Sequence, residues 1–127
     1  MNCLLDVNLL MALLWERHEH HGRTRRWLAT AKNIAVCPLT ELGFVRISTQ
    51  PAFGATVEQA RQMLRDWKAA TKPRFLPCDL ELLKTAAPKA GAKTTDYYLA
   101  GLAEAHGCRL ATLDNNLGHP AAFSVPD

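Results

Sequence analysis

The segment Leu4–Leu14 reads LLDVNLLMALL, and it places one carboxylate, Asp6, inside one of the most apolar runs of the chain. Residues 3–5 are typical of a buried strand, and the residues up to about Trp15 favour a helix. An ionised carboxylate in such surroundings must be paired, be protonated or hold a metal ion. No lysine or arginine precedes Arg17. The partner of Asp6 must therefore come from elsewhere in the chain.

Outward from this segment, short β-type runs alternate with helical runs along the chain. Strands are expected at about 3–5, 34–37, 74–76, 108–113 and 123–125. Helices are expected up to about residue 15 and over 23–31, 38–49, 57–70 and 94–106. A further helix, capped by Asp79, is expected to contain Leu82, Leu83 and Ala86. This alternation, with nearly continuous apolar strands, predicts a parallel sheet covered on both faces.

The predicted fold is a three-layer α/β sandwich with a central, mainly parallel sheet of four to five strands flanked by helices. A chain of 127 residues, 48% hydrophobic and 21% charged, suits a single domain spanning residues 1–127. No apolar run approaches the roughly 20 residues that cross a bilayer. The apolar start has no basic residues before it and is interrupted by Asp6, so we expect no signal peptide and a cytosolic protein.

Cysteine and histidine residues give no zinc-like pattern. The four cysteines are widely spread without a CxxC motif, which favours buried free thiols over disulfides; they are Cys3, Cys37, Cys78 and Cys108. His18, His20 and His21 form a cluster for which exposure at a helix junction is favoured over an acid/base pair or a transition-metal site.

The net charge is only +3, but the basic residues are grouped. One group is Arg23, Arg25 and Arg26, and the other is Arg61, Arg65, Lys68, Lys72 and Arg74. Either group can be a solvated helix face or a surface that attracts a polyanion such as RNA. Charge alone leaves both interpretations open.

Eight of the twelve acidic residues are explained by solvation or capping, because they lie on polar helix faces, at an expected cap or at the terminus. These are Glu16, Glu19, Glu58, Asp66, Asp79, Glu81, Glu104 and Asp127. The other four differ. Asp6 and Asp114 end strands, whereas Glu41 and Asp96 open helices and share a helical face with apolar residues.

Ligands of α/β sheets bind beyond the carboxyl ends of the strands. Asp6, Glu41 and Asp114 belong at this edge directly, and Asp96 can reach it from the start of its helix. Each one alone is explained by a helix end or a strand end. Together they would repel, by about 4 kcal/mol for one pair 4 Å apart at a dielectric constant near 20. A divalent cation relieves this repulsion, and oxygen ligands favour Mg²⁺ or Mn²⁺.

The segments LLDVNLLMALL, CPLTELGFVRI and TTDYYLAGLAEAHGCRLATLD, the last followed by NN, resemble PIN-domain ribonucleases, in particular VapC-type toxins of bacterial toxin–antitoxin modules. The resemblance implies an endoribonuclease that uses Mg²⁺ or Mn²⁺. It implies that the catalytic and metal-binding positions are Asp6, Glu41, Asp96 and Asp114. It implies supporting roles for Asn8, Thr40, Arg46, Thr112 and Asn116.

The resemblance further implies a homodimer and a VapB-like antitoxin whose tail enters the active-site groove. One departure concerns the residues after Asp114, where some relatives carry another carboxylate and this chain has Asn115 and Asn116. The number of metal ions, one or two, therefore stays open. The corresponding hypothesis is hydrolysis by a metal-activated water that attacks phosphorus in line.

Two other classes of protein share parts of this pattern. A haloacid-dehalogenase-like phosphatase also carries an aspartate after its first strand, but it needs a DxD motif where this chain has Asp6-Val7-Asn8. A non-catalytic receiver-like or RNA-binding module would not need four convergent carboxylates. Measuring RNA cleavage with and without Mg²⁺ separates these classes.

Overall fold

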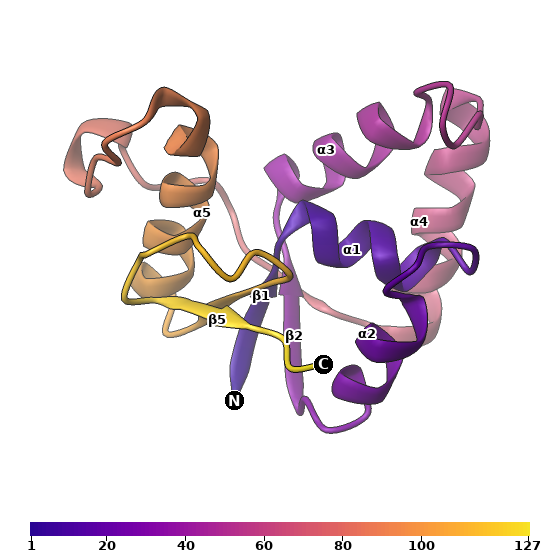
Figure 1. Ribbon diagram of the computed structural model, residues 1–127, viewed down its shortest axis with the longest axis horizontal. Helices are drawn as coiled ribbons and strands as arrows, with labels where there is room; N and C mark the ends of the chain where they lie inside the picture. Colours follow the sequence, from indigo (N-terminus) through magenta and orange to yellow (C-terminus); the bar gives the residue numbers. More distant parts are fainter.

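The computed structural model describes all residues from Met1 to Asp127, and a five-stranded sheet runs through its centre (Figure 1). The strands are β1 (Asn2–Leu5), β2 (Asn33–Val36), β3 (Arg74–Phe75), β4 (Arg109–Thr112) and β5 (Ala122–Ser124). Their order across the sheet is β3-β2-β1-β4-β5, and every pairing is parallel. The predicted parallel sheet is confirmed at the upper end of its expected strand number.

Five α-helices cover the sheet, four on one face and one on the other (Figure 1). They are α1 (Val7–Leu14), α2 (His21–Leu28), α3 (Pro38–Ser48), α4 (Val57–Thr71) and α5 (Thr94–Ala105). Two short 3₁₀-helices, η1 (Leu82–Lys84) and η2 (Gly91–Lys93), precede α5. The three-layer sandwich is therefore confirmed. No helix is both long and apolar enough to cross a membrane.

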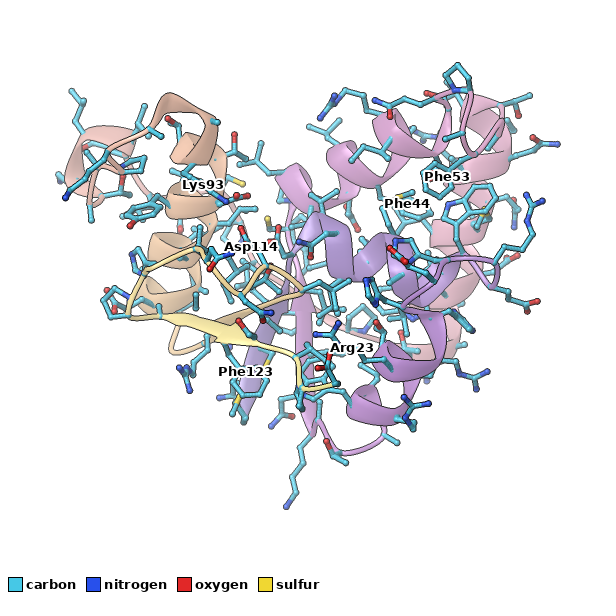
Figure 2. All side chains as sticks on the ribbon, viewed as in Figure 1. Arg23, Phe44, Phe53, Lys93, Asp114 and Phe123 are labelled. Atoms are coloured by element: carbon cyan, nitrogen blue, oxygen red, sulfur yellow. The ribbon has the colours of Figure 1, made fainter.

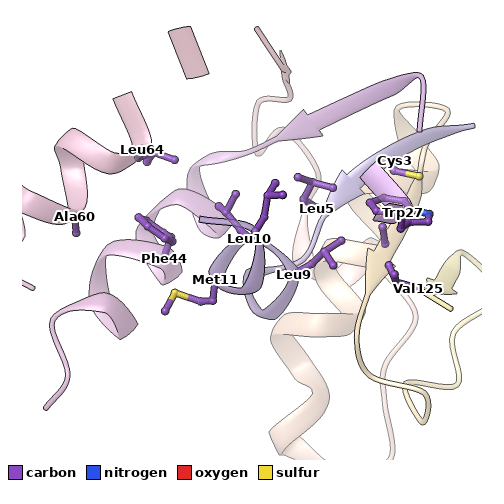
Figure 3. Close-up of a cluster of buried hydrophobic side chains, with 12 residues drawn as sticks. Cys3, Leu5, Leu9, Leu10, Met11, Trp27, Phe44, Ala60, Leu64 and Val125 are labelled. Atoms are coloured by element: carbon purple, nitrogen blue, oxygen red, sulfur yellow. The ribbon is translucent and has the colours of Figure 1, made fainter. Parts of the chain in front are cut away.

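Alternate residues of β1 point into two separate hydrophobic clusters, as the period of a strand requires. Leu5 packs with the helices α1 to α4, in a cluster that includes Leu10 and Phe44 (Figure 3). Leu4 packs on the opposite face, against residues of α5 such as Leu99. Both faces of β1 are thus buried, which explains why the opening segment is apolar without alternation.

The prediction of a helix after Asp79 is wrong. Only the short 3₁₀-helix η1 forms there, and the Asp79 carboxylate accepts a hydrogen bond from Nε2 of His106, 2.8 Å away. Leu83 is 96% exposed and Leu82 is 54% exposed, so this segment has no apolar face on the core. An isolated helix of this length is unstable without such packing.

Two further expectations about side-chain exposure need correction. Cys3, Cys37 and Cys108 are buried free thiols as expected, but Cys78 is exposed. The histidine cluster is half-buried and not exposed. The Nδ1 atom of His21 lies 2.9 Å from the carbonyl oxygen of Ala12, so its ring is tied to the end of α1.

Candidate active site

The parallel sheet brings the carboxyl ends of β1, β2 and β4 to one edge. Asp6 directly follows β1, and its backbone N–H donates to the Ala111 carbonyl of β4 across 2.9 Å. Asp114 lies two residues beyond the end of β4, and Glu41 lies in the first turn of α3, which follows β2. Asp96 lies in the first turn of α5.

Asp6 is fixed by two hydrogen bonds. Its carboxylate accepts the Val7 backbone N–H across 2.7 Å, which makes it the N-cap of α1, and the Thr112 hydroxyl across 2.8 Å. The side chain is buried, and this burial raises the pKa of Asp6 to about 6. The hydrogen bond from Thr112 acts against this shift, and the nearby charges of Asp96 and Asp114 add to it.

Asp96 is the least compensated carboxylate of the group. It is half-buried and takes part in no hydrogen bond or ion pair. Burial raises the pKa of Asp96, while the positive charge of Lys93 lowers it and the negative charge of Asp114 raises it further. The Asp96 oxygens are thus available to a ligand.

Lys93, at the end of η2, supplies the positive charge of this group. Its Nζ donates to the Asp114 carboxylate across 2.6 Å, and Figure 2 shows the two side chains next to each other. This hydrogen bond lowers the pKa of Asp114 and raises the pKa of Lys93. The ammonium group also interacts electrostatically with Asp96 and Asp6. One lysine therefore balances part of the charge of three carboxylates.

Glu41 is paired with a different lysine. Its carboxylate accepts a hydrogen bond from Nζ of Lys68, on α4, at 2.5 Å. Asp6, Asp96 and Asp114 thus interact electrostatically with one another and with Lys93, and Glu41 is paired with Lys68 of α4.

Thr112 and Asn8 connect Asp6 to the end of β4. The Thr112 hydroxyl donates to Asp6 and accepts the backbone N–H of Asp114 across 3.1 Å. The Asn8 side chain donates to the same hydroxyl across 3.2 Å and accepts the Leu113 backbone N–H across 3.2 Å. This network sets the distance between the end of β1 and the loop that carries Asp114.

The other expected supporting residues lie differently. The buried Thr40 hydroxyl bonds to the backbone of Cys37 and closes the first turn of α3. Arg46 is exposed in the last turn of α3, and its guanidinium makes no hydrogen bond or ion pair. Asn116 contributes its backbone N–H to the Asp114 carboxylate across 2.8 Å.

Lys68 and Lys93 were not expected from the sequence to be site residues. Lys68 stands in the second basic group of the chain, and Lys93 lies three positions before Asp96. The sequence shows both lysines, but it does not indicate which carboxylate each of them pairs with. The partner depends on how distant segments pack.

The donor chemistry of the site fits a hard divalent cation. Asp6, Asp96 and Asp114 offer only oxygen ligands, and the half-buried Asp96 carboxylate lacks any partner. The cage is not preformed, because no three acidic, histidine or cysteine side chains gather closely enough to hold one ion together. Lys93 balances part of the charge of this group.

Comparison with known sequences finds relatives along nearly the whole chain. The profile of the PIN domain matches residues 3–122. The chain is 42% identical over 120 residues to Ribonuclease VapC38 of Mycobacterium tuberculosis, with 87% of this chain and 84% of that protein covered. It is 34% identical over 122 residues to Ribonuclease VapC29 of the same organism, with 94% and 90% covered.

Comparison with solved structures finds the same fold at low sequence identity. A crystal structure of Mycobacterium tuberculosis VapC20, a Sarcin-Ricin loop cleaving toxin, superposes with a TM-score of 0.73 at 12% identity, with 99% of this chain and all of that chain (100%) covered. VapBC2 from Rickettsia felis, bound to a DNA fragment from its promoter, superposes with a TM-score of 0.63 at 13% identity, with 98% and 97% covered.

Proposed function

Because the chain belongs to the PIN domain family, together with VapC ribonucleases of Mycobacterium tuberculosis, we propose that it is an endoribonuclease and the toxin of a toxin–antitoxin pair. It hydrolyses RNA phosphodiester bonds with the help of Mg²⁺ or Mn²⁺. Family membership sets aside the haloacid-dehalogenase-like and receiver-like alternatives, which are folds of other families.

The observation that carries this proposal is the group of three carboxylates at the carboxyl edge of the sheet. Asp6 is buried, Asp96 is half-buried without a partner, and Asp114 is balanced by Lys93. Burying negative charge in this way is unfavourable for folding unless a cation is bound there. The arrangement is therefore best explained by function.

Each residue has a distinct task in the proposed reaction. Asp6 is held in one orientation by Val7 and Thr112, so that its oxygens stay directed at the site. Asp96 and Asp114 supply further oxygen ligands. A bound divalent ion would act as a Lewis acid on the phosphodiester and lower the pKa of a water molecule. Glu41, whose carboxylate accepts a hydrogen bond from Lys68, would orient the attacking water.

The proposed partners are RNA, a VapB-like antitoxin and a second copy of the chain. Support for the antitoxin comes from two structures of similar fold, VapBC2 and FitAB bound to an IR36 DNA fragment. The FitAB structure superposes on this chain with a TM-score of 0.68 at 18% identity. The RNA substrate would be met in the cytoplasm. Homodimerisation rests on the family resemblance alone.

RNA cleavage by the purified chain, freed of any antitoxin, tests the proposal. We expect cleavage with Mg²⁺ or Mn²⁺, none with EDTA, and none by Asp96→Asn in either case. Glu104→Gln is the matched control, since Glu104 lies exposed on the same helix and should leave cleavage unchanged. Full cleavage by Asp96→Asn, or cleavage that EDTA does not affect, would rule out the proposed mechanism.

A further inference from the structure

A cavity of about 610 Å³ opens between α3 and α4, which lie next to each other in Figure 1. Glu41 lines it from α3, and three cationic side chains line it from α4. These are Arg61, Arg65 and Lys68. The lining therefore carries three positive charges and one negative charge.

The cations form one stripe along α4. Arg61, Arg65 and Lys68 are spaced by four and three residues. This spacing places the three on one face of the helix, along about 10 Å at 1.5 Å per residue. Arg61 forms no ion pair. Arg65 donates to the Gln62 side chain and reaches Glu58 only at 3.8 Å, whereas Lys68 is paired with Glu41. The charges of the two arginines are therefore available to a partner.

An exposed aromatic ring lies beside the stripe. Phe75 is the last residue of the edge strand β3, and its side chain is 50% exposed. The Nζ atom of Lys68 lies 5.4 Å from the centre of the Phe75 ring and also bonds to Glu41. Phe75 pairs in register with Val36, the last residue before the turn that starts α3. The Lys68 ammonium group thus contacts both the Phe75 ring and the Glu41 carboxylate.

We propose that this cavity and Phe75 together bind a single-stranded segment of RNA that leads to Glu41. The phosphates of the strand lie on Arg61, Arg65 and Lys68, and one base stacks on the Phe75 ring. The inference deepens the proposed ribonuclease function and rests on it, since it names the part of the substrate that this surface holds.

The chemistry of the surface favours this ligand over a general anion. Proteins that hold single strands combine a positively charged groove with aromatic rings on which bases stack. The bases of an RNA duplex are not available for stacking on a side chain, whereas those of loops and ends are. An acidic peptide would use the arginines but would gain nothing from an exposed ring.

RNA binding measured by fluorescence anisotropy tests the proposal. The probe is a labelled, unstructured 12-nucleotide RNA, and the full-length chain carries Asp96→Asn to prevent cleavage. Arg61→Gln/Arg65→Gln should weaken binding at least about 10-fold and lower the salt dependence of log K by about 1.4, for two lost phosphate contacts on a single strand. Phe75→Leu should weaken binding at least about 5-fold through lost stacking.

The matched control is Arg25→Gln/Arg26→Gln, which removes the same charge from exposed positions on α2. It should change affinity less than about 3-fold. Equal losses in the two double variants, or unchanged binding by Phe75→Leu, would overturn the proposal. So would a Phe75→Leu variant that alters the oligomeric state by light scattering and leaves RNA binding intact, because the ring would then contact a second copy of the chain.

Cleavage kinetics separate this inference from the proposed function. In the chain with Asp96 intact, Arg61→Gln/Arg65→Gln and Phe75→Leu should raise KM and retain kcat at saturating RNA. Absence of cleavage by the unmodified chain would contradict the proposed function, and the binding comparison would still decide the inference. An equal effect of Phe75→Leu on a polyglutamate peptide and on RNA would show general anion attraction and overturn it.

Discussion

At the scale of single residues, Asp6 combines a structural and a functional role. Its carboxylate caps α1 through the Val7 N–H, yet burial raises the pKa of this same group to about 6. A capping aspartate at a surface would remain ionised at no cost. Here the position beyond β1 forces the cap into the interior, so that the residue destabilises the fold when it is charged.

The first prediction concerns the pH dependence of stability. The folded-state pKa of Asp6 lies above its ordinary 3.8, so the folded chain holds its proton to higher pH than the unfolded chain. Its contribution to stability is therefore present below pH 4 and lost as pH rises through 6, by about 3 kcal/mol. Asp6→Asn removes this dependence and should be more stable than the unmodified chain at pH 8.

Urea unfolding at pH 5 and pH 8 measures the difference between the two chains. Asp66→Asn is the control, because Asp66 is exposed on α4 and should leave the pH dependence unchanged. If Asp6→Asn lost as much stability between these pH values as the unmodified chain, the raised pKa of Asp6 would not be the cause of the pH dependence.

A second residue-scale prediction concerns Lys93, whose ammonium stands near three carboxylates. Lys93→Met leaves these charges uncompensated, so the melting temperature without divalent ions should fall. Mn²⁺ should then bind more tightly, because no positive charge competes with it, and each tenfold gain in affinity adds about 1.4 kcal/mol. Thermal shift across a Mn²⁺ titration measures both effects.

Lys89→Met provides the control, since Lys89 is exposed, lies close in the chain and forms no ion pair. Its Mn²⁺ titration should match that of the unmodified chain. If Lys93→Met gave the same Mn²⁺ dependence as well, Lys93 would have no influence on the ion site.

At the scale of elements, the site depends on how closely α3 approaches α1. Gly43 of α3 lies against Val7, and a Cβ atom at this position would stand 2.7 Å from the Val7 Cγ2 atom. Val7 directly follows Asp6, so any displacement of Val7 reaches the N-cap carboxylate. The glycine thus sets both the spacing of the two helices and the position of a site residue.

Gly43→Ala should therefore destabilise the fold. An alanine in a helix interior normally gains about 0.5–1 kcal/mol over glycine, but contact with a stiff β-branched side chain costs about 1–3 kcal/mol. We expect a net loss in the urea midpoint, together with reduced cleavage. Gly91→Ala is the control, because a Cβ atom there meets nothing within 4 Å. Equal midpoints for the two variants would refute a tight contact.

At the scale of the whole molecule, Arg23 links the C-terminal end of the chain to helix α2 by hydrogen bonds. From α2 it donates to the carbonyl oxygens of Pro126, across 3.0 Å, and of Val125, across 2.5 Å. Figure 2 shows Arg23 beside the end of the chain, beyond β5. The edge strand β5, only three residues long, is thereby held from beyond its own end.

Arg23→Gln should loosen this edge without unfolding the molecule. Hydrogen bonds from a charged donor contribute about 1.5–3 kcal/mol, so local opening of β5 should become easier by roughly this amount. The rate of amide hydrogen exchange should increase at Val125, and it should increase less in β1. Arg26→Gln, exposed on the same helix, should leave exchange unchanged. Unaltered exchange at Val125 in Arg23→Gln would show that the arginine does not hold the strand.

Much of the fold was predictable because its signals are local. The five strands and the helices around α1, α3, α4 and α5 follow from runs of apolar residues with a period of two or 3.6 residues. The segment after Asp79 shows where this fails. Leu82 and Leu83 suggested a helix, but no surface of the core lies next to them, and packing decides whether so short a helix forms.

For the site, the sequence by itself determined which acidic residues stand at strand ends and helix starts, and hence that Asp6, Glu41 and Asp114 belong to one edge of a parallel sheet. Only the tertiary structure decided how their charges are balanced. Lys93 bonds to Asp114 and interacts electrostatically with Asp96 and Asp6, while Lys68 of α4 pairs with Glu41. The physical reason is that the spacing of apolar residues along the sequence determines on which face of a helix or strand a side chain lies. The partner of a charged side chain depends instead on the packing of segments that are distant in the chain.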